Sequence, residues 1–524
     1  MAIESFRTQG SHHRTPRVEK GAGAPAILYR RSAMTRALTA SVLAISLLAA
    51  AHPSDQTPPP IEAFIAAASP RDGEARAALE TIAAGWSDGH AAMIVDLARF
   101  MRPARRATGA DSTDALDFDD GEPVLGRPGG EFPATPPEPA SARIRRRLIQ
   151  FLERQTGRRF GDDLRRWREW MWALPYAPHP EYAAYKGIVY GNVDPRMRAF
   201  FPAGVRSEIR LDEIDWGGVT VNGIPPLEYP KAVTVAEARY LRDSHVVFGT
   251  VVNGEARAYP KRILGWHEMA LDRLGGVELT VVYCTLCGTA IPYESVVGGG
   301  RRRFGTSGLL YRSNKLMFDH ETNSLWSTLE GRPVVGPLTG RSLELTPHWM
   351  VTTTWGEWRR EHPATTVLSI DTGFDRDYAE GAAYRDYFST DRLMFSVPRM
   401  DTRLKNKAEV VVFRLAGADG REQAVAISVA MLRRTRLFQA VAAGRPIVVV
   451  TSVAGANRVY AAGEVRFERV EADGRLRDAS GRLWRQTAEA LELESDGRRL
   501  PSVASFRAFW FGWYAQFPDT LLFQ

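Results

Sequence analysis

Cysteine is almost absent from this sequence: Cys284 and Cys287 are the only two in 524 residues. A chain of this length can bury a large apolar core, so its stability does not depend on disulfides that join distant segments. Histidine is missing after His362, and cysteine is missing after Cys287. Any site that needs a cysteine or a histidine therefore has to lie before residue 363.

Long runs of one charge are also lacking. The formal net charge is +7, but acidic and basic residues are interleaved along the chain. Basic blocks with interspersed aromatic residues, which mark nucleic-acid surfaces, do not occur. We therefore expect no nucleic-acid partner. No nucleotide cofactor is evident either, and the sequence leaves other partners unknown.

The one apolar run near the start, Ala37 to Ala51, is short for a membrane span. Basic residues precede it and small residues end it, which predicts a signal peptide at about residues 34–51. Residues 1–52 are then an upstream extension and a leader. We expect an exported, periplasmic or extracellular protein with no integral membrane span in the mature chain. An uncleaved N-terminal anchor is the alternative.

The rest of the chain divides into segments that differ in composition and in the spacing of apolar residues. Apolar residues at helical spacing predict one helical segment over 53–102 and a second over 141–204, separated by a Pro- and Gly-rich flexible linker at 103–140. Short apolar runs punctuated by Gly, Pro and Asn follow, over 205–400 and 401–524. The predicted fold class is α+β: a mainly β body of two pseudo-repeats, preceded by a small helical region.

Both cysteines lie between two apolar runs, LTVVY and TAIPYE. Runs rich in β-branched residues on each side, with Gly288 directly after Cys287, predict strand, tight turn and strand. Pro292 argues against a helix after the turn. The two sulfurs are therefore expected on a rigid turn.

The β body contains an internal duplication, here called copy one (244–368) and copy two (408–522). A gapless alignment puts Thr451 at Cys284, Ala454 at Cys287 and Gly455 at Gly288. Two tryptophan motifs also recur in the same order: Trp355-x-x-Trp358 as Trp510-x-x-Trp513, and Leu325-Trp326 as Leu483-Trp484. Copy two keeps the tryptophans, which suit core packing, but it has neither cysteine nor histidine. Copy one alone is predicted to carry chemistry.

Five ordered motifs, NGIPPLEYP, NGEARAYPKRILGWHE, VVYCTLCGTAIPYE, FGTSGLLYRSNKLMFDHETNSLWS and GFDRDYAEGAAYRDYF, lie within about residues 205–415. Together they resemble the bacterial and archaeal family known as domain of unknown function 3179, although Thr285 stands where that family usually has proline. The resemblance implies an exported protein and brings no activity with it.

Metal binding is the function that the residues favour most. Two thiolates at Cys-x-x-Cys spacing need further ligands, and His267 and His320 lie in the motifs that flank them. Such a set would suit zinc, or copper(I) with its preference for sulfur and imidazole. The alternative for each histidine is a hydrogen-bonded core or surface residue.

Two other functions stay open, so whether the protein is an enzyme is uncertain. Cys284 and Cys287 could be the catalytic pair of a dithiol-disulfide redox enzyme. They could also form a structural disulfide in a ligand-binding or interaction module, although so short a loop contributes only about 2 kcal/mol or less. Arg257, Tyr259 and Glu268 could line a pocket beside the turn, where Arg257 would bind an anion. The alternative for Arg257 is a salt bridge between neighbouring strands.

Overall fold

A computed structural model describes residues 57–101, 140–417 and 420–524. The expected signal peptide at about 34–51 lies outside the described residues, and so does the expected linker apart from residue 140, which already begins a helix. Within the described part of the chain, no helix has both the length and the hydrophobicity needed to cross a membrane.

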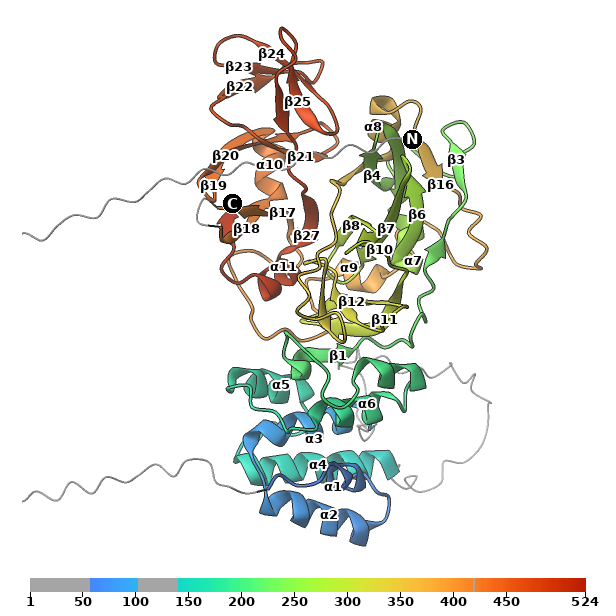
Figure 1. The fold of residues 1–524 in the computed structure, drawn as a ribbon, viewed down its shortest axis with the longest axis vertical. Coiled ribbons are helices and arrows are strands. Elements are labelled where there is room, and N and C mark those ends of the chain that lie inside the picture. The colour runs from blue at the N-terminus through green and yellow to red at the C-terminus, as the bar shows by residue number, and fades with distance from the viewer. Residues whose placement is uncertain (1–56, 102–139, 418–419) are drawn as a thin grey trace, which may run out of the picture. The chain divides into compact units, whose positions relative to one another are not determined.

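The helical region comes first in the described chain and is coloured blue to green in Figure 1. It comprises α1 (Ile61–Ala66), α2 (Asp72–Ala84), α3 (Ala91–Arg99), α4 (Ala140–Thr156), α5 (Leu164–Ala173) and α6 (Tyr182–Tyr190), with short 3-10 turns at Asp88–His90, Pro195–Phe200 and Leu211–Glu213. Helices from both sides of the expected linker share one apolar core, which also takes in Leu316 and Val335 of the β body. The two predicted helical segments therefore pack as one region.

Helix α4 shows how the sequence produces this packing. Its buried residues Ile144, Leu148 and Leu152 recur at intervals of four, so they form one apolar stripe. Arg145 follows the first of them and is also buried. Its guanidinium donates to the carbonyl oxygens of Ala98 (3.1 Å) and Met101 (3.1 Å), so that α4 is fixed to the end of α3.

The first part of the β body holds copy one, drawn in green through yellow to light orange in Figure 1. Its elements are β1 (Ile214–Trp216), β2 (Leu227–Glu228), β3 (Ala232–Thr234), β4 (Val246–Val252), β5 (Glu255–Pro260), α7 (Lys261–His267), β6 (Met269–Leu274), β7 (Val277–Cys284), β8 (Thr289–Glu294), β9 (Val296–Val297), β10 (Gly300–Arg301), β11 (Phe304–Tyr311), β12 (Asn314–Asp319), β13 (Leu325–Ser327), β14 (Arg332–Val335), β15 (Val351–Thr354), α8 (Trp355–Glu361), β16 (Thr366–Leu368) and α9 (Arg385–Ser389).

Copy two follows in orange to red. Its elements are β17 (Glu409–Ala416), β18 (Glu422–Ser428), α10 (Val429–Thr435), β19 (Leu437–Ala442), β20 (Arg445–Thr451), β21 (Asn457–Ala461), β22 (Phe467–Val470), β23 (Leu476–Asp478), β24 (Leu483–Gln486), β25 (Ala490–Leu493), β26 (Arg499–Pro501), β27 (Phe506–Phe509), α11 (Trp510–Gln516) and β28 (Leu521–Phe523). The predicted α+β class, with a mainly β body after a small helical region, is confirmed.

The two copies have the same strand order. In copy one, β15, β4, β5 and β16 are successive neighbours in one sheet, and in copy two β27, β17, β18 and β28 are. The last pair is parallel in both sheets, whereas the other pairs are antiparallel. A second sheet follows in each copy, β6-β7-β8 and β19-β20-β21. We interpret this shared strand order as the result of an internal duplication.

Tryptophan contacts agree between the copies as well. The Trp326 indole donates to Asp319 (2.8 Å), and the Trp484 indole donates to Asp478 (2.9 Å). Likewise, the indoles of Trp358 and Trp513 each donate to a threonine seven residues later, at 2.9 and 2.7 Å. Because a buried indole N–H needs an acceptor, these pairs explain why both copies keep the tryptophans.

The gapless alignment is wrong by one residue in the strand that precedes each turn. Tyr283 N–H donates to the carbonyl of Glu268, and Thr451 N–H donates to that of Arg436, both at 2.8 Å. Thr451 therefore matches Tyr283, and Ser452 rather than Thr451 matches Cys284. Between matching pairs of strand residues, the turn of copy two is one residue shorter than the turn of copy one. The difference is visible only from which residues pair across the strands.

Candidate functional site

The cysteines lie on a β-hairpin, as predicted. Strand β7 ends at Cys284, β8 begins at Thr289, and Cys284 pairs with Thr289 across the ladder. The two cysteines form a disulfide, with a Cα–Cα distance of 5.5 Å. Gly288 has a φ of +66°, which glycine adopts without strain. We call residues 284–288 the knuckle.

Both cysteines of the knuckle are fully buried. Cys284 is 1% exposed and Cys287 is 0% exposed. Aromatic side chains, among them Tyr387 of α9, Phe395 and Phe509 of β27, pack against the disulfide. The Tyr387 hydroxyl also donates to the Leu286 carbonyl (2.7 Å). A reagent can therefore reach the sulfurs only if this aromatic cover moves.

A buried carboxylate contacts the knuckle from copy one itself. Glu268 accepts hydrogen bonds from the hydroxyls of Thr285 (2.6 Å) and Tyr384 (2.9 Å) and from the ammonium of Lys315 (2.9 Å). Thr285 lies between the two cysteines, so the carboxylate is joined directly to the knuckle. Burial lowers the pKa of Lys315, while Glu268 opposes that change. We call Glu268, Thr285, Lys315 and Tyr384 the Glu268 cluster.

Unusual backbone conformations position this cluster. Glu268 ends α7 with a φ of +55°, and its N–H donates to the Leu264 carbonyl (2.7 Å). Lys315 follows a two-residue hairpin turn in which Arg312 (φ 50°) and Ser313 (φ 61°) are both left-handed. Such turns favour Asn and Gly. Left-handed conformations of other residues are retained mainly where the surrounding structure, or a function, requires them.

Copy two closes the remaining side of the knuckle. Phe509 N–H donates to the Cys287 carbonyl (2.7 Å), and the Phe509 ring lies against Gly288. In the next helix, α11, a Cβ added to Gly512 would lie only 2.7 Å from the Cys287 Cβ. The chain therefore needs glycine at this position for copy two to approach the disulfide.

The second knuckle, at 452–456, makes the reciprocal contact with copy one. The Ser452 hydroxyl and the Ala454 N–H donate to the carboxylate of Glu357 in α8, at 2.8 and 3.3 Å. Glu357 is the third residue of Trp355-x-x-Trp358, and Gly512 is the third residue of Trp510-x-x-Trp513. Each knuckle thus faces the same position of the other copy's tryptophan helix.

The structure does not bring the predicted metal ligands together. His267 is buried, and its two ring nitrogens face the Pro225 carbonyl and the Tyr378 hydroxyl. His320 is exposed and packs on Phe318. Among the described residues, no three His, Cys, Asp or Glu side chains are grouped closely enough to hold a metal ion. As arranged, the residues do not fit a copper or zinc site, and metal binding stays a prediction.

The predicted anion pocket is occupied by a salt bridge. The Arg257 guanidinium donates to Asp272 at 2.7 and 2.8 Å, and the Tyr259 hydroxyl donates to the same carboxylate (2.8 Å). The alternative weighed for Arg257 was a salt bridge between neighbouring strands; the ion pair that is present joins β5 to β6, which belong to different sheets. Of the three predicted pocket residues, Glu268 alone contacts the knuckle.

Sequence reasoning missed Lys315, Tyr384 and Gly512. Lys315 and Tyr384 lie in two of the motifs that carry the family resemblance, but nothing in either motif indicates a partner 47 or 116 residues away. Gly512 had a clearer signal. It is a glycine inside a helix of copy two, where copy one has Glu357, and a helical glycine commonly marks a close contact.

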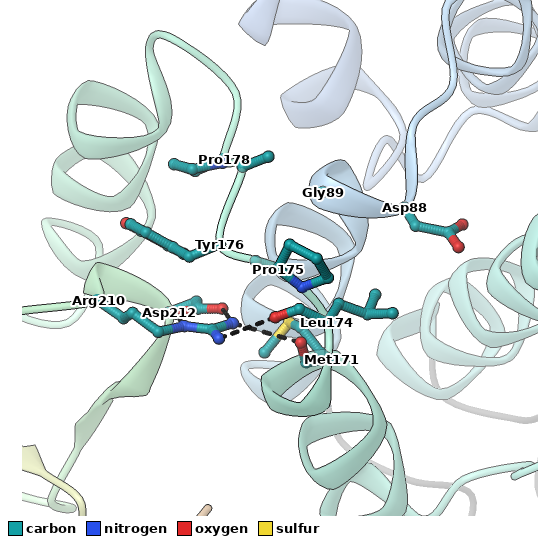
Figure 2. Close-up of a pocket in the computed structure, with 11 residues that line it drawn as sticks. Asp88, Gly89, Met171, Leu174, Pro175, Tyr176, Pro178, Arg210 and Asp212 are labelled. Atoms are coloured by element: carbon teal, nitrogen blue, oxygen red, sulfur yellow. Dashed lines mark hydrogen bonds and ion pairs between the residues drawn. The ribbon is translucent and has the colours of Figure 1, made fainter. Parts of the chain in front are cut away.

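Figure 2 shows a hollow in the helical region, where the end of α5 meets Tyr176 and Arg210. The Arg210 guanidinium donates to Asp212 (2.7 Å) and to the Leu174 carbonyl (3.0 Å). Its charge therefore serves to join segments of the fold, and we assign no ligand to this hollow.

Comparison with known proteins adds the family. No curated protein and no solved structure matches the chain. A family model described as protein of unknown function (DUF3179) matches residues 221–520. The match begins later than the 205 expected from the motifs and runs past 415 through copy two, so the family unit includes both knuckles. This chain belongs to the DUF3179 family.

Proposed function

We propose that Cys284 and Cys287 are a reversible dithiol-disulfide pair that exchanges electrons with an external dithiol. The observation that carries the proposal is the Glu268–Lys315 ion pair, which is bonded to Thr285 between the two cysteines. The pair is almost fully buried, with side chains 10% and 6% exposed.

The energetic cost of the ion pair supports a chemical role. Removing two charges from water costs several kcal/mol for each ion, so a buried pair is a poor way to stabilise a turn. Copy two holds its matching turn with Ser452 and has the exposed Arg436 in place of Glu268. The hairpin therefore does not need the ion pair. Buried titratable groups beside a reactive pair are typical of functional sites.

Reduction by an external dithiol takes two steps. A donor thiolate attacks one Sγ, the Cys284–Cys287 bond breaks, and the other cysteine leaves as a thiolate. The second donor thiol then attacks the mixed disulfide. The donor becomes a disulfide, both cysteines become thiols, and two electrons and two protons pass to the protein. The positive charge of the Lys315 ammonium favours the leaving thiolate. The Glu268 cluster can deliver the proton that this thiolate takes up.

Access to the sulfurs requires movement of the segment between β16 and β17. Its one helix, α9, spans only Arg385–Ser389. Among the side chains that hold this segment are two lysines. The Lys407 ammonium donates to the carbonyls of Tyr387 and Thr390, and the Lys261 ammonium lies 4.4 Å from the centre of the Phe388 ring. An incoming donor has to displace these contacts together with the hydrogen bonds from Tyr384 to Glu268 and from Tyr387 to the Leu286 carbonyl.

The test is a redox titration of the full chain in dithiothreitol buffers, with alkylation and mass spectrometry to count free thiols. We expect two thiols to appear and disappear reversibly while circular dichroism shows a folded protein. Lys315→Met should slow exchange by at least about tenfold. The matched control, Asp272→Asn, breaks an equally buried ion pair that does not contact the knuckle, and it should leave the exchange rate unchanged.

Failure has a clear form in this experiment. If thiols appear only under conditions that unfold the chain, the disulfide is structural, and a ligand-binding or interaction module becomes the better interpretation. Metal binding is tested beside it by elemental analysis of protein prepared without chelator, with Cys284→Ser, Cys287→Ser as control. Near-stoichiometric copper or zinc that disappears in the variant would favour the metal site instead. Export is a separate proposal, tested by locating the protein after fractionation of cells.

A further inference from the structure

Asn314, the first residue of β12, has a buried amide with an unmatched oxygen. Its side-chain nitrogen donates to the carbonyls of Gly512 (3.0 Å) and Arg312 (3.1 Å). Both amide hydrogens are therefore used, which fixes the orientation of the amide. The opposite atom, Oδ1, is buried and has no hydrogen-bond donor among the described residues, although Asn314 is only 2% exposed.

The unmatched oxygen and Cys287 both lie next to Gly512. A Cβ added to Gly512 would lie 3.2 Å from Asn314 Oδ1 and 2.7 Å from Cys287 Cβ, so the two side chains border the same point. In the disulfide, Cys287 has no hydrogen to donate. After reduction it carries an S–H, which is a weak donor. Because a buried acceptor without a donor costs about 1–3 kcal/mol, this oxygen is better satisfied in the reduced protein.

We propose that Asn314 is a positioning residue for the reduced state, and that its Oδ1 accepts a hydrogen bond from the thiol of Cys287. The inference rests on the proposed redox function, because in the natural chain the hydrogen bond forms only when the disulfide opens. It makes reduction easier and holds the Cys287 thiol in one orientation. Asn314 thereby links the redox state of the knuckle to Gly512 in copy two.

Copy two offers a matched asparagine without this property. Asn457 borders the second knuckle and is 7% exposed. Its nitrogen donates to Thr451 (3.0 Å), and its oxygen accepts from Arg507 (3.0 Å). Both ends of that amide are therefore satisfied, and its oxygen has no need of a thiol. Asn457→Leu is the natural control for substitutions at Asn314.

The first experiment leaves the redox reaction aside. In Cys284→Ser, Cys287 is a free thiol whatever the disulfide does, and its S–H stretching band can be recorded by infrared spectroscopy. We expect the band to move to higher frequency when Asn314→Leu is added, because the acceptor is lost. Asn314→Asp, which keeps an oxygen at the same place, should restore a hydrogen-bonded band. Asn457→Leu should leave the band where it is.

The second experiment measures the dithiol-disulfide equilibrium constant of the otherwise unchanged protein. Loss of one hydrogen bond of about 1 kcal/mol in Asn314→Leu should shift that constant about fivefold towards the disulfide. Asn457→Leu should shift it by less than a factor of about two.

The outcomes separate the two proposals. An S–H band that does not respond to Asn314→Leu overturns the inference, even if the disulfide exchanges reversibly. A band that responds, in a protein whose disulfide never opens while folded, supports the hydrogen bond and overturns the redox function. If Asn314→Leu fails to fold, the band of Asn314→Asp in the Cys284→Ser background decides: a shift to lower frequency supports the bond, and no shift overturns it.

Discussion

The turns of copy one and copy two join equivalent strands, but different side chains hold them. In copy one the turn holds a disulfide and the buried partners Glu268 and Lys315. In copy two the matching places carry Ser452 and the exposed Arg436. Since the second turn folds without sulfur or a buried ion pair, the fold does not require them. The molecule thus contains its own control for the chemistry of copy one.

The reciprocal contacts between the copies teach a second lesson. The same helix position carries Glu357 where it meets a turn of backbone N–H and serine, and Gly512 where it meets the disulfide. A carboxylate suits the first partner because it accepts hydrogen bonds. Only a residue without a side chain suits the second. At this helix position, the difference between the copies is therefore matched to the turn that each residue faces.

The largest expected effect tests what the copies share. Trp326→Ala and Trp484→Ala each remove a fully buried indole bonded to an aspartate, so each should lower the free energy of unfolding by about 3–5 kcal/mol. Urea denaturation followed by circular dichroism measures both losses. A loss in one copy that is less than half of that in the other would mean that the two cores are not equivalent.

The next effect tests where the copies differ. Lys315→Met leaves Glu268 buried without its cation and should cost about 3 kcal/mol. Arg436→Ala, at the exposed residue that matches Glu268, should change stability by about 0.5 kcal/mol or less. Adding Glu268→Gln to Lys315→Met should restore most of the loss, as measured by the same denaturation. If both single changes cost the same, the ion pair is not specific to copy one.

Gly512→Ala probes the contact between the copies. The new Cβ would lie 2.7 Å from Cys287 Cβ, so the helix or the turn has to move, at a cost of about 2 kcal/mol. The clash involves Cβ and not sulfur. The cost should therefore persist in the Cys284→Ser, Cys287→Ser background. Disappearance of the cost in that background, in thermal or urea denaturation, would show that the sulfurs and not the turn exclude a side chain.

The smallest effect concerns pH. The His362 ring packs at a tilt against Trp358, and the Phe517 ring packs in the same way against Trp513 at the matching place. Burial, with help from Arg458, lowers the pKa of His362 from 6.5 to about 4. The unfolded chain binds the proton more readily, so His362 favours folding above about pH 6.5 and progressively less as the pH falls towards 4. After allowance for its partial exposure, the change amounts to about 1 kcal/mol.

Substitutions at His362 and at its copy-two counterpart Phe517 test this pH effect. The free energy of unfolding falls between pH 7 and pH 4.5, and His362→Phe should make that fall smaller by about 1 kcal/mol. Phe517→Leu should leave the slope with pH unchanged. A slope that does not respond to His362→Phe would assign acid sensitivity to other groups, for example His90, whose pKa burial also lowers to about 4.

Much of the fold could be predicted from the sequence because the signals were local. Gly288 between two β-branched runs predicted the hairpin, and the spacing of Ile144, Leu148 and Leu152 predicted α4. The repeated tryptophans predicted two similar units, and both units do have one strand order. The one-residue difference between the turns was not visible, because it depends on which residues pair across β6–β7 and β19–β20.

The site was predicted less well, for a geometric reason. His267 and Glu268 are adjacent, but the left-handed backbone at Glu268 sends them to different surroundings. His267 bonds Pro225 and Tyr378, whereas Glu268 reaches the knuckle. The prediction chose the histidine as the partner of the sulfurs because imidazole is a common ligand. Spacing along the chain could not reveal that a lysine on β12 would bond the neighbouring carboxylate instead.

The contact of Phe509 with Cys287 also sets an order of events during synthesis. The residues that close the last side of the knuckle lie far downstream of both cysteines, so the ribosome adds them long after Cys284 and Cys287 have emerged. Until Phe509 and Gly512 arrive, that side of the growing chain is open to an oxidant. The sulfurs can therefore be joined while the chain is still being made, and α11 then covers a bond that already exists.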